Sequence, residues 1–274
     1  MNSNLPKVLH QIGAAPLAVH ALRAASTLEP EKSVVVTGHG AEMVETTLSK
    51  HDDELIFVRQ TEQNGTAHAV DQARAALDGF TGDVVVLYGD TPFVSGETLQ
   101  SMVDARETAD VVVLGFNAKD PGRYGRLITN GTSLDAIVEA KDATPEQLAV
   151  TLCNSGVVMC AAQTMFELIA DVKNENASEE YYLTDIIGLA RARDLTAVAV
   201  TCDEAETLGI NTRRELAAAE AAFQARKRTE ALEDGVSLAS PESTFFAYDT
   251  VLGRDAVIGP NVVFGPDVTV ESGA

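Results

Sequence analysis

The stretch Asp83-Val84-Val85-Val86-Leu87-Tyr88-Gly89-Asp90-Thr91-Pro92 decides the fold of this 274-residue chain. Its first half is an apolar, β-branched run, which is typical of a strand covered on both faces of a sheet. Asp90 follows just past the carboxyl end of that strand, where open α/β sheets bind their ligands. An aspartate in this position is often only a turn former. Flanked by Gly89 and Thr91-Pro92, it is also a candidate Mg²⁺ ligand.

Similar runs recur on both sides of this stretch and alternate with helical patterns. The expected strands cover 33–37, 55–58, 83–88 and 110–114, with shorter ones at 126–129, 135–139 and 156–160. The expected helices cover 41–50, 66–77, 97–108, 179–193 (with Ser178 as N-cap) and 212–232. This alternation predicts an α/β fold with a Rossmann-like, doubly wound, mainly parallel sheet. The region from Tyr124 to Cys160 is expected to form a lid or insertion beside that sheet.

The spacing of the apolar residues changes after Ser240. Apolar residues then fall six positions apart, at Leu252, Ile258, Phe264 and Val270. A six-residue period of this kind predicts a parallel β-helix built of hexapeptides. About three hexapeptides make one coil, so we expect little more than one coil here and a chain that is cut off within the repeat.

Composition excludes several classes of protein. The formal net charge is −21, from 41 acidic and 20 basic residues, which argues against a nucleic-acid partner and requires that any bound phosphate meet local positive charge or a metal ion. No apolar run approaches the ~18–20 residues of a membrane helix, and the N-terminus lacks a signal-peptide pattern. We therefore expect a cytoplasmic protein without a membrane partner. Three cysteines without a CxxC pair suggest neither a disulfide framework nor a zinc site.

Two further segments carry candidate binding residues. Lys7 lies in Leu5-Pro6-Lys7-Val8-Leu9, where a lysine taken alone would be ordinary surface charge. Gly65-Thr66 opens a predicted helix directly after a strand. Backbone N–H groups at a helix start favour anionic or carbonyl ligands, although plain capping explains the pair equally well.

Taken together, the segments have a recognisable order. They are LPKVLH, QTEQNGTAHA, LYGDTP, DPGRYGRL, IVEAKDAT, CNSGV, EEYYLTDII and GIN. This series resembles the pyrophosphorylase half of the bacterial bifunctional UDP-N-acetylglucosamine pyrophosphorylase/glucosamine-1-phosphate N-acetyltransferases. The resemblance covers essentially the whole chain, and the hexapeptides begin where that family starts its left-handed β-helix. Each motif alone is weak, but eight motifs in order are specific.

The resemblance implies a role for each matching residue. Lys7 matches the lysine on the nucleotide phosphate, and Asp90 and Asn211 match the protein ligands of Mg²⁺. The expected nucleotide-binding residues are Lys7, Gln60, Gly65, Thr66, Tyr88 and Gly89. The expected sugar-binding residues are Gly125, Glu139, Asn154 and Thr184. Of these, Lys7 and Asp90 are expected to be catalytic.

The implied reaction joins UTP and N-acetylglucosamine-1-phosphate into UDP-N-acetylglucosamine and pyrophosphate, a step toward cell-wall and lipopolysaccharide sugars. The implied domains are a nucleotidyltransferase domain at 1–211, a helical arm at 212–240 and the start of a left-handed β-helix at 241–274. The acetyltransferase residues would lie on later coils. A homotrimer is expected for the full-length family. Two alternatives stay open: another sugar-1-phosphate nucleotidyltransferase, and a catalytically silent nucleotide-binding module.

One departure from the family pattern is marked. The Leu-Ala-Ala-Gly-x-Gly-Thr-Arg-Met loop does not occur in this sequence, and Met1 coincides with its last residue. We expect that the family's first strand and glycine-rich phosphate loop are missing from this chain. Turnover by the chain as written is accordingly expected to be poor.

Overall fold

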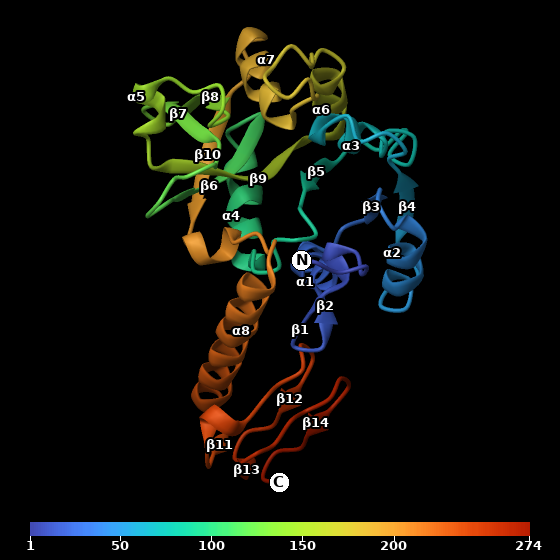
Figure 1. Cartoon of the computed structure of the whole chain (residues 1–274), viewed down its shortest axis with the longest axis vertical. Coiled ribbons are helices and arrows are strands. Elements are labelled where there is room, and N and C mark those ends of the chain that lie inside the picture. The colour runs from blue at the N-terminus through green and yellow to red at the C-terminus, as the bar shows by residue number, and fades with distance from the viewer.

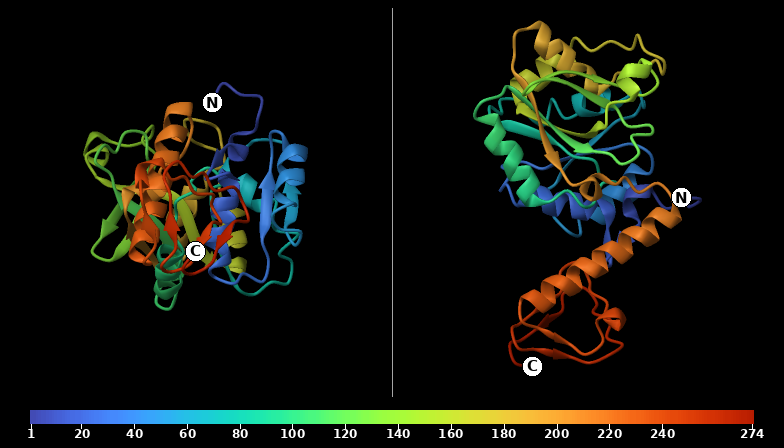
Figure 2. Two further views of the ribbon diagram at one scale, coloured as in Figure 1. Left: turned by 90° about the horizontal axis from the view of Figure 1, so that it is seen from below. Right: turned by 90° about the vertical axis from the view of Figure 1, so that its left-hand side faces the viewer.

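The computed structural model describes all residues, 1–274, and divides into an α/β body, a long helix and a small C-terminal coil (Figure 1). The helix α8 (Arg213–Glu233) leads away from the body, and the coil lies at its far end (Figure 2). No helix combines the length and the apolar character that crossing a membrane requires.

The main sheet of the body is mixed. Its strands, in spatial order, are β10 (Ala197–Cys202), β6 (Val111–Asn117), β9 (Leu152–Ala161), β7 (Arg126–Asn130) and β8 (Ser133–Val138), with β5 (Asp83–Val86) also on β9. β10 and β6 are parallel, whereas β9 runs antiparallel to both β5 and β6. The α/β class is confirmed, but the sheet has fewer parallel pairings than expected. β9 enters the sheet after the β7–β8 hairpin and runs opposite to all three of its neighbours, β5, β6 and β7.

A second, smaller sheet stands apart from the first. β3 (Val34–Thr37) and β4 (Ile56–Arg59) pair with each other in parallel and with no other strand. β5 likewise pairs only with β9. The valines of β3 and β5 are therefore half-buried, not buried as expected for strands inside one continuous sheet.

Helices cover both faces of the main sheet, and β6 shows why its sequence is a continuous apolar run. Val111 and Val113 belong to one core cluster, and Val112 and Leu114 belong to another. Successive strand residues point to opposite faces, so a strand with two covered faces needs apolar residues at every position. The covering helices are α1 (Leu17–Ser26) and α4 (Gly96–Arg106) on one face, and α6 (Ala162–Ile169) and α7 (Ile186–Ala192) on the other.

Short elements complete the body. They are η1 (Lys7–Leu9), β1 (Gln11–Ile12), β2 (Ala15–Pro16), α2 (Ala41–Leu48), α3 (Thr66–Asp71), α5 (Pro145–Leu148), η2 (Leu183–Asp185) and η3 (Glu204–Thr207). The cysteines are all free thiols. Burial raises the pKa of Cys160 to about 12, so this thiol is unreactive at neutral pH.

The helix expected at 179–193 begins later in the structure, and Ser178 is not its N-cap. Helical structure begins only at Leu183. The preceding segment is extended because Tyr181 donates its backbone N–H to the Asn64 carbonyl and accepts from the Ala67 N–H, at 2.8 and 2.9 Å. The Ser178 hydroxyl instead accepts a hydrogen bond from the Lys141 ammonium. Long-range backbone pairing here overrides local helix propensity.

The C-terminal coil is built of short parallel pairings. β11 (Ser237–Leu238) pairs with β13 (Val257–Ile258), and β12 (Val251–Leu252) pairs with β14 (Thr269–Val270). Phe245 forms a further parallel bridge with Val263. In the last two pairings the partners lie three hexapeptides apart, as expected for one coil, and the coil has a triangular outline (Figure 2). The residues at the six-residue period point inward, where Phe264 and Val270 pack on Phe246 and its neighbours.

A buried glutamine joins α8 to this coil. Gln224 is 3% exposed, and its amide donates to the Phe246 carbonyl and accepts from the Phe246 N–H, both at 2.8 Å. Both polar groups of one buried backbone unit therefore depend on a single side chain.

Replacing Gln224 by leucine tests this attachment. Gln224→Leu is expected to lower the free energy of unfolding by about 2–4 kcal/mol, because two buried backbone groups lose their partners. Chemical denaturation followed by circular dichroism measures the change. Gln100→Leu, at an exposed glutamine of α4, is the matched control and should change stability by less than about 0.5 kcal/mol. Equal effects of the two substitutions would contradict the role of Gln224.

Candidate functional site

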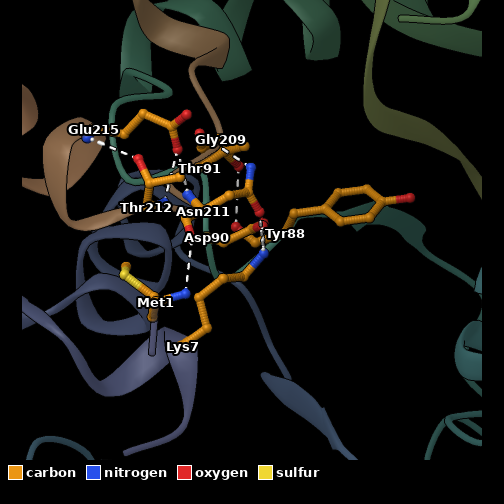
Figure 3. A network of polar contacts seen from close by, with 9 residues as sticks. All are labelled: Met1, Lys7, Tyr88, Asp90, Thr91, Gly209, Asn211, Thr212 and Glu215. Atoms are coloured by element: carbon orange, nitrogen blue, oxygen red, sulfur yellow. Dashed lines mark hydrogen bonds and ion pairs between the residues drawn. The ribbon is translucent and has the colours of Figure 1, made fainter. Parts of the chain in front are cut away.

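Lys7, Asp90 and Asn211 meet at one point, although they come from three distant parts of the chain (Figure 3). The Lys7 ammonium donates to the Asp90 carboxylate and, at 2.9 Å, to the Asn211 side-chain oxygen. Two oxygens from different segments therefore converge on one cation. Both oxygens are of the hard type that Mg²⁺ prefers, so the donor set fits that ion.

The start of α8 holds Asn211 in place. Thr212 is the N-cap of this helix, and its hydroxyl accepts from the Glu215 N–H. The Glu215 carboxylate in turn accepts from the backbone N–H groups of Asn211 and Thr212, at 2.7 and 2.9 Å. This reciprocal capping box fixes the backbone that presents the Asn211 amide.

Asp90 is held by the turn that ends β5. Thr91 donates both its N–H and its hydroxyl to the Tyr88 carbonyl. The Asp90 carbonyl accepts the Ile210 N–H at 3.1 Å, which ties this turn to the segment before α8. A side chain at Gly89 would come within 3.3 Å of Val8, so the turn packs closely on the segment that carries Lys7.

The four expected sugar-binding residues lie together. Thr184 donates its hydroxyl to the Glu139 carboxylate at 3.1 Å, and the Asn154 N–H donates to the Gly125 carbonyl at 2.8 Å. A Cβ at Gly125 would lie 3.5 Å from Glu139 and 3.6 Å from Asn154. Burial raises the pKa of the Glu139 carboxyl above its ordinary range. The cluster therefore combines hydroxyl, amide and carboxyl groups around a residue without a side chain.

Tyr88 lies between the two groups. Burial raises the pKa of its phenol to about 12, and the Asp90 and Glu139 carboxylates add to this rise. Its ring packs so closely on Gly156 that a Cβ there would be 2.7 Å from the ring. Tyr88 and Asn154 also line one small cavity with Thr184. The carboxylates of Asp90 and Glu139 thus both lie near enough to Tyr88 to act on its phenol.

Three of the expected nucleotide-binding residues, Gln60, Gly65 and Thr66, are engaged within the protein. Gln60 donates to the Gly65 carbonyl at 3.0 Å and also contacts His68. The Thr66 hydroxyl accepts the Leu183 N–H at 2.9 Å. Gly65 has φ +114°, and a Cβ there would lie 2.5 Å from the Tyr181 carbonyl oxygen. These contacts give Gly65 and Thr66 a packing role in addition to any binding role.

Sequence reasoning missed two parts of the site. The first is Glu215, although the spacing Thr212-x-x-Glu215 is a capping-box signature that a sequence does reveal. The backbone of Tyr181, which pairs with the Gly65 region, has no such signal. No group of three or more His, Cys, Asp or Glu side chains is arranged to hold a metal ion, so a metal here would have few protein ligands.

Comparison with known proteins shows to which family the chain belongs. The model of the MobA-like NTP transferase domain matches residues 1–229. The chain belongs to the MobA-like NTP transferase family. Membership of this family confirms the nucleotidyltransferase assignment made from the motifs.

Close relatives of this NTP transferase carry the name Bifunctional protein GlmU. The relative from Roseobacter denitrificans is 61% identical over 254 residues, which are 93% of this chain and 56% of that protein. The relative from Cereibacter sphaeroides is 61% identical over 274 residues, 100% of this chain and 60% of that protein. The chain therefore spans little more than half of the length of these relatives, and the resemblance to bifunctional proteins is confirmed.

Solved structures share the fold at low identity. A UDP-glucose pyrophosphorylase complexed with UDP-glucose has a TM-score of 0.64 and 17% identity, over 81% of this chain and 91% of that one. A nucleoside-diphosphate-sugar pyrophosphorylase from Vibrio cholerae has a TM-score of 0.65 and 14% identity, over 80% of this chain and 93% of that one. At this identity the likeness shows a common fold.

The raised pKa of Glu139 predicts a pH-dependent effect on stability. Above the ordinary carboxyl pKa, the folded state still holds a proton that the unfolded chain has released. The free energy of unfolding therefore decreases as the pH rises from the ordinary carboxyl pKa through the raised pKa of Glu139. A glutamine cannot ionise, so the melting temperature of Glu139→Gln relative to the unmodified chain is expected to rise between pH 4 and pH 7 in thermal denaturation.

Glu146→Gln provides a control of opposite sign. The pKa of Glu146 is lowered, because its own backbone N–H and the Thr144 hydroxyl donate to it. The melting temperature of Glu146→Gln relative to the unmodified chain should fall or stay constant between pH 4 and pH 7. A flat profile for Glu139→Gln would contradict the burial of that carboxyl.

Proposed function

We propose that this chain is the uridyltransferase part of a bifunctional enzyme and forms UDP-N-acetylglucosamine from UTP and N-acetylglucosamine-1-phosphate. The observation that carries the proposal is the convergence of Asp90 and Asn211 on one cation. The Asp90 and Glu139 carboxylates both act on the Tyr88 phenol, and Glu139 accepts from Thr184. Relatives at about 60% identity that are named bifunctional proteins support it further.

Asp90 and Asn211 are the residues that would hold Mg²⁺. When bound, the ion would neutralise phosphate charge in a protein of net charge −21. Lys7 would supply a further positive charge to the nucleotide phosphates. Since a lysine ammonium is a compact point charge on a flexible stem, it can follow those phosphates.

The remaining residues would orient the two substrates. Gln60, Gly65 and Thr66 would contact the uracil, and a glutamine amide offers the donor and the acceptor that the uracil edge requires. Tyr88 and Gly89 would line the space at the end of β5. The sugar moiety would contact Gly125, Glu139, Asn154 and Thr184.

The chemistry needs little covalent participation from the protein. A phosphate oxygen of N-acetylglucosamine-1-phosphate attacks the α-phosphorus of UTP, a new P–O bond forms, and the bond to the bridging oxygen breaks as pyrophosphate leaves. The attacking oxygen is already anionic, so no general base is required. Catalysis therefore rests on positioning and charge stabilisation.

The domain division follows the same proposal. Residues 1–211 form the nucleotidyltransferase domain, 212–240 the helical arm, and 241–274 the start of a left-handed β-helix. The parallel pairings of Val251 with Thr269 and of Phe245 with Val263 support this division. In the full-length enzyme we expect a cytoplasmic homotrimer that supplies cell-wall precursors.

Pyrophosphate release by residues 1–274 tests the function. With UTP, Mg²⁺ and enzyme in excess, N-acetylglucosamine-1-phosphate should react at least ~10-fold faster than glucose-1-phosphate, as expected where a site's polar groups pair with a substrate amide. Faster reaction of glucose-1-phosphate would favour another sugar nucleotidyltransferase. UTP binding by calorimetry without any product would favour a silent binding module, and neither binding nor product would contradict the proposal.

Asp90→Asn tests the assigned metal ligand. The variant should lose about 10²–10³-fold in uridyltransfer rate, because a preorganised charge beside the transferring phosphate is removed. Asp53→Asn, at an exposed aspartate between α2 and β4, is the matched control and should keep its rate. An Asp90→Asn rate unchanged at saturating Mg²⁺ would make Asp90 a turn residue only.

A further inference from the structure

The Lys7 ammonium occupies the point where the two proposed metal ligands converge. It binds the Asp90 carboxylate and the Asn211 side-chain oxygen at the same time, the latter at 2.9 Å. The only other ammonium bound to Asn211, that of Met1, contacts the backbone carbonyl and not the side chain, at 3.2 Å. Lys7 is therefore the cation that satisfies these two side chains.

We propose that Lys7 is a placeholder cation, which a divalent ion must displace before it can bind Asp90 and Asn211. The inference rests on the metal site of the proposed function and adds a second position for Lys7. In the first position the ammonium neutralises Asp90. In the second, after displacement, it is free to bind the phosphate of the incoming nucleotide.

Size and charge make the two cations mutually exclusive. A divalent ion such as Mg²⁺ binds oxygen at about 2.0–2.1 Å and requires nearly octahedral geometry. An ammonium that already bridges the same two oxygens fills that position, and like charges repel strongly at such short range. The two ions would thus exchange rather than share the site.

The setting of Lys7 permits this exchange. Its side chain is 38% exposed and that of Asp90 is 22% exposed, so the ion pair is partly solvated and contributes little stability by itself. The four-carbon stem can rotate away without any movement of the backbone. Asn211, in contrast, is fixed through Glu215 and Thr212. The ligands are therefore rigid and the placeholder is mobile.

Mn²⁺ binding in the absence of nucleotide tests the proposal. Free Mn²⁺ can be counted by electron paramagnetic resonance in titrations of the whole chain. Lys7→Met keeps the length of the side chain but removes its charge, and it is expected to bind Mn²⁺ about three- to ten-fold more tightly. Lys119→Met, at an exposed lysine after β6, should leave the affinity unchanged. Equal or weaker binding by Lys7→Met would overturn the proposal.

Two further measurements separate this inference from the metal site itself. Asp90→Asn should abolish the Mn²⁺ binding both with Lys7 and with Met at position 7. If Asp90→Asn binds Mn²⁺ as tightly as the unmodified chain, the proposed metal site is wrong and this inference is wrong with it. Binding that depends on Asp90 but not on Lys7 would overturn this inference alone.

Amine labelling of the unmodified chain provides a test that does not depend on a variant. Acetylation of lysines, followed by mass spectrometry, reports whether each ammonium is engaged. Saturating Mg²⁺ should raise the labelling rate of Lys7 about two-fold or more, while Lys119 stays constant. An unchanged Lys7 rate at Mg²⁺ concentrations that protect the chain against thermal unfolding would overturn the displacement.

Discussion

The ion pair between Lys7 and Asp90, with Asn211 as third member, is the interaction that brings the side chains of the site to one point. It joins η1, the end of β5 and the start of α8. In a chain of net charge −21, a carboxylate at this point needs a cation, because the Glu215 carboxylate already lies on the backbone of Asn211. One positive charge thus bridges the side chains of three segments, which the Ile210–Asp90 backbone hydrogen bond and the packing of Val8 against Gly89 also join.

The smaller sheet reaches this point by packing and not by backbone pairing. Val35 of β3 and Phe57 of β4 pack on a cluster that includes Leu9, Val19 and Leu48. Gln60, which follows β4, is held by its backbone N–H on the Thr37 carbonyl at 2.8 Å and by its side-chain bond to the Gly65 carbonyl. The Gln60–Thr66 region thus combines apolar packing of β3 and β4 with backbone hydrogen bonds to neighbouring segments.

The segment 181–184 connects the two sides. The Tyr181 backbone pairs with Asn64 and Ala67, and the Leu183 N–H binds the Thr66 hydroxyl. One residue later, Thr184 binds Glu139. A displacement of the segment around Gly65 would therefore be transmitted to the proposed sugar-binding cluster through a short, hydrogen-bonded stretch of chain.

The sequence by itself determined the α/β class, most strand and helix positions, the long helix α8 and the six-residue period of the coil. These features follow from local periodicity, as the alternation along β6 and the apolar spacing at Leu252 and Ile258 show. The candidate residues came from ordered motifs, and each motif is local as well. The antiparallel course of β9, the split between the two sheets and the late start of the helix after Ser178 were decided only by tertiary structure. So was the meeting of Lys7 with Asp90 and Asn211, because pairing partners and side-chain distances depend on how distant segments fold together, which local pattern does not encode.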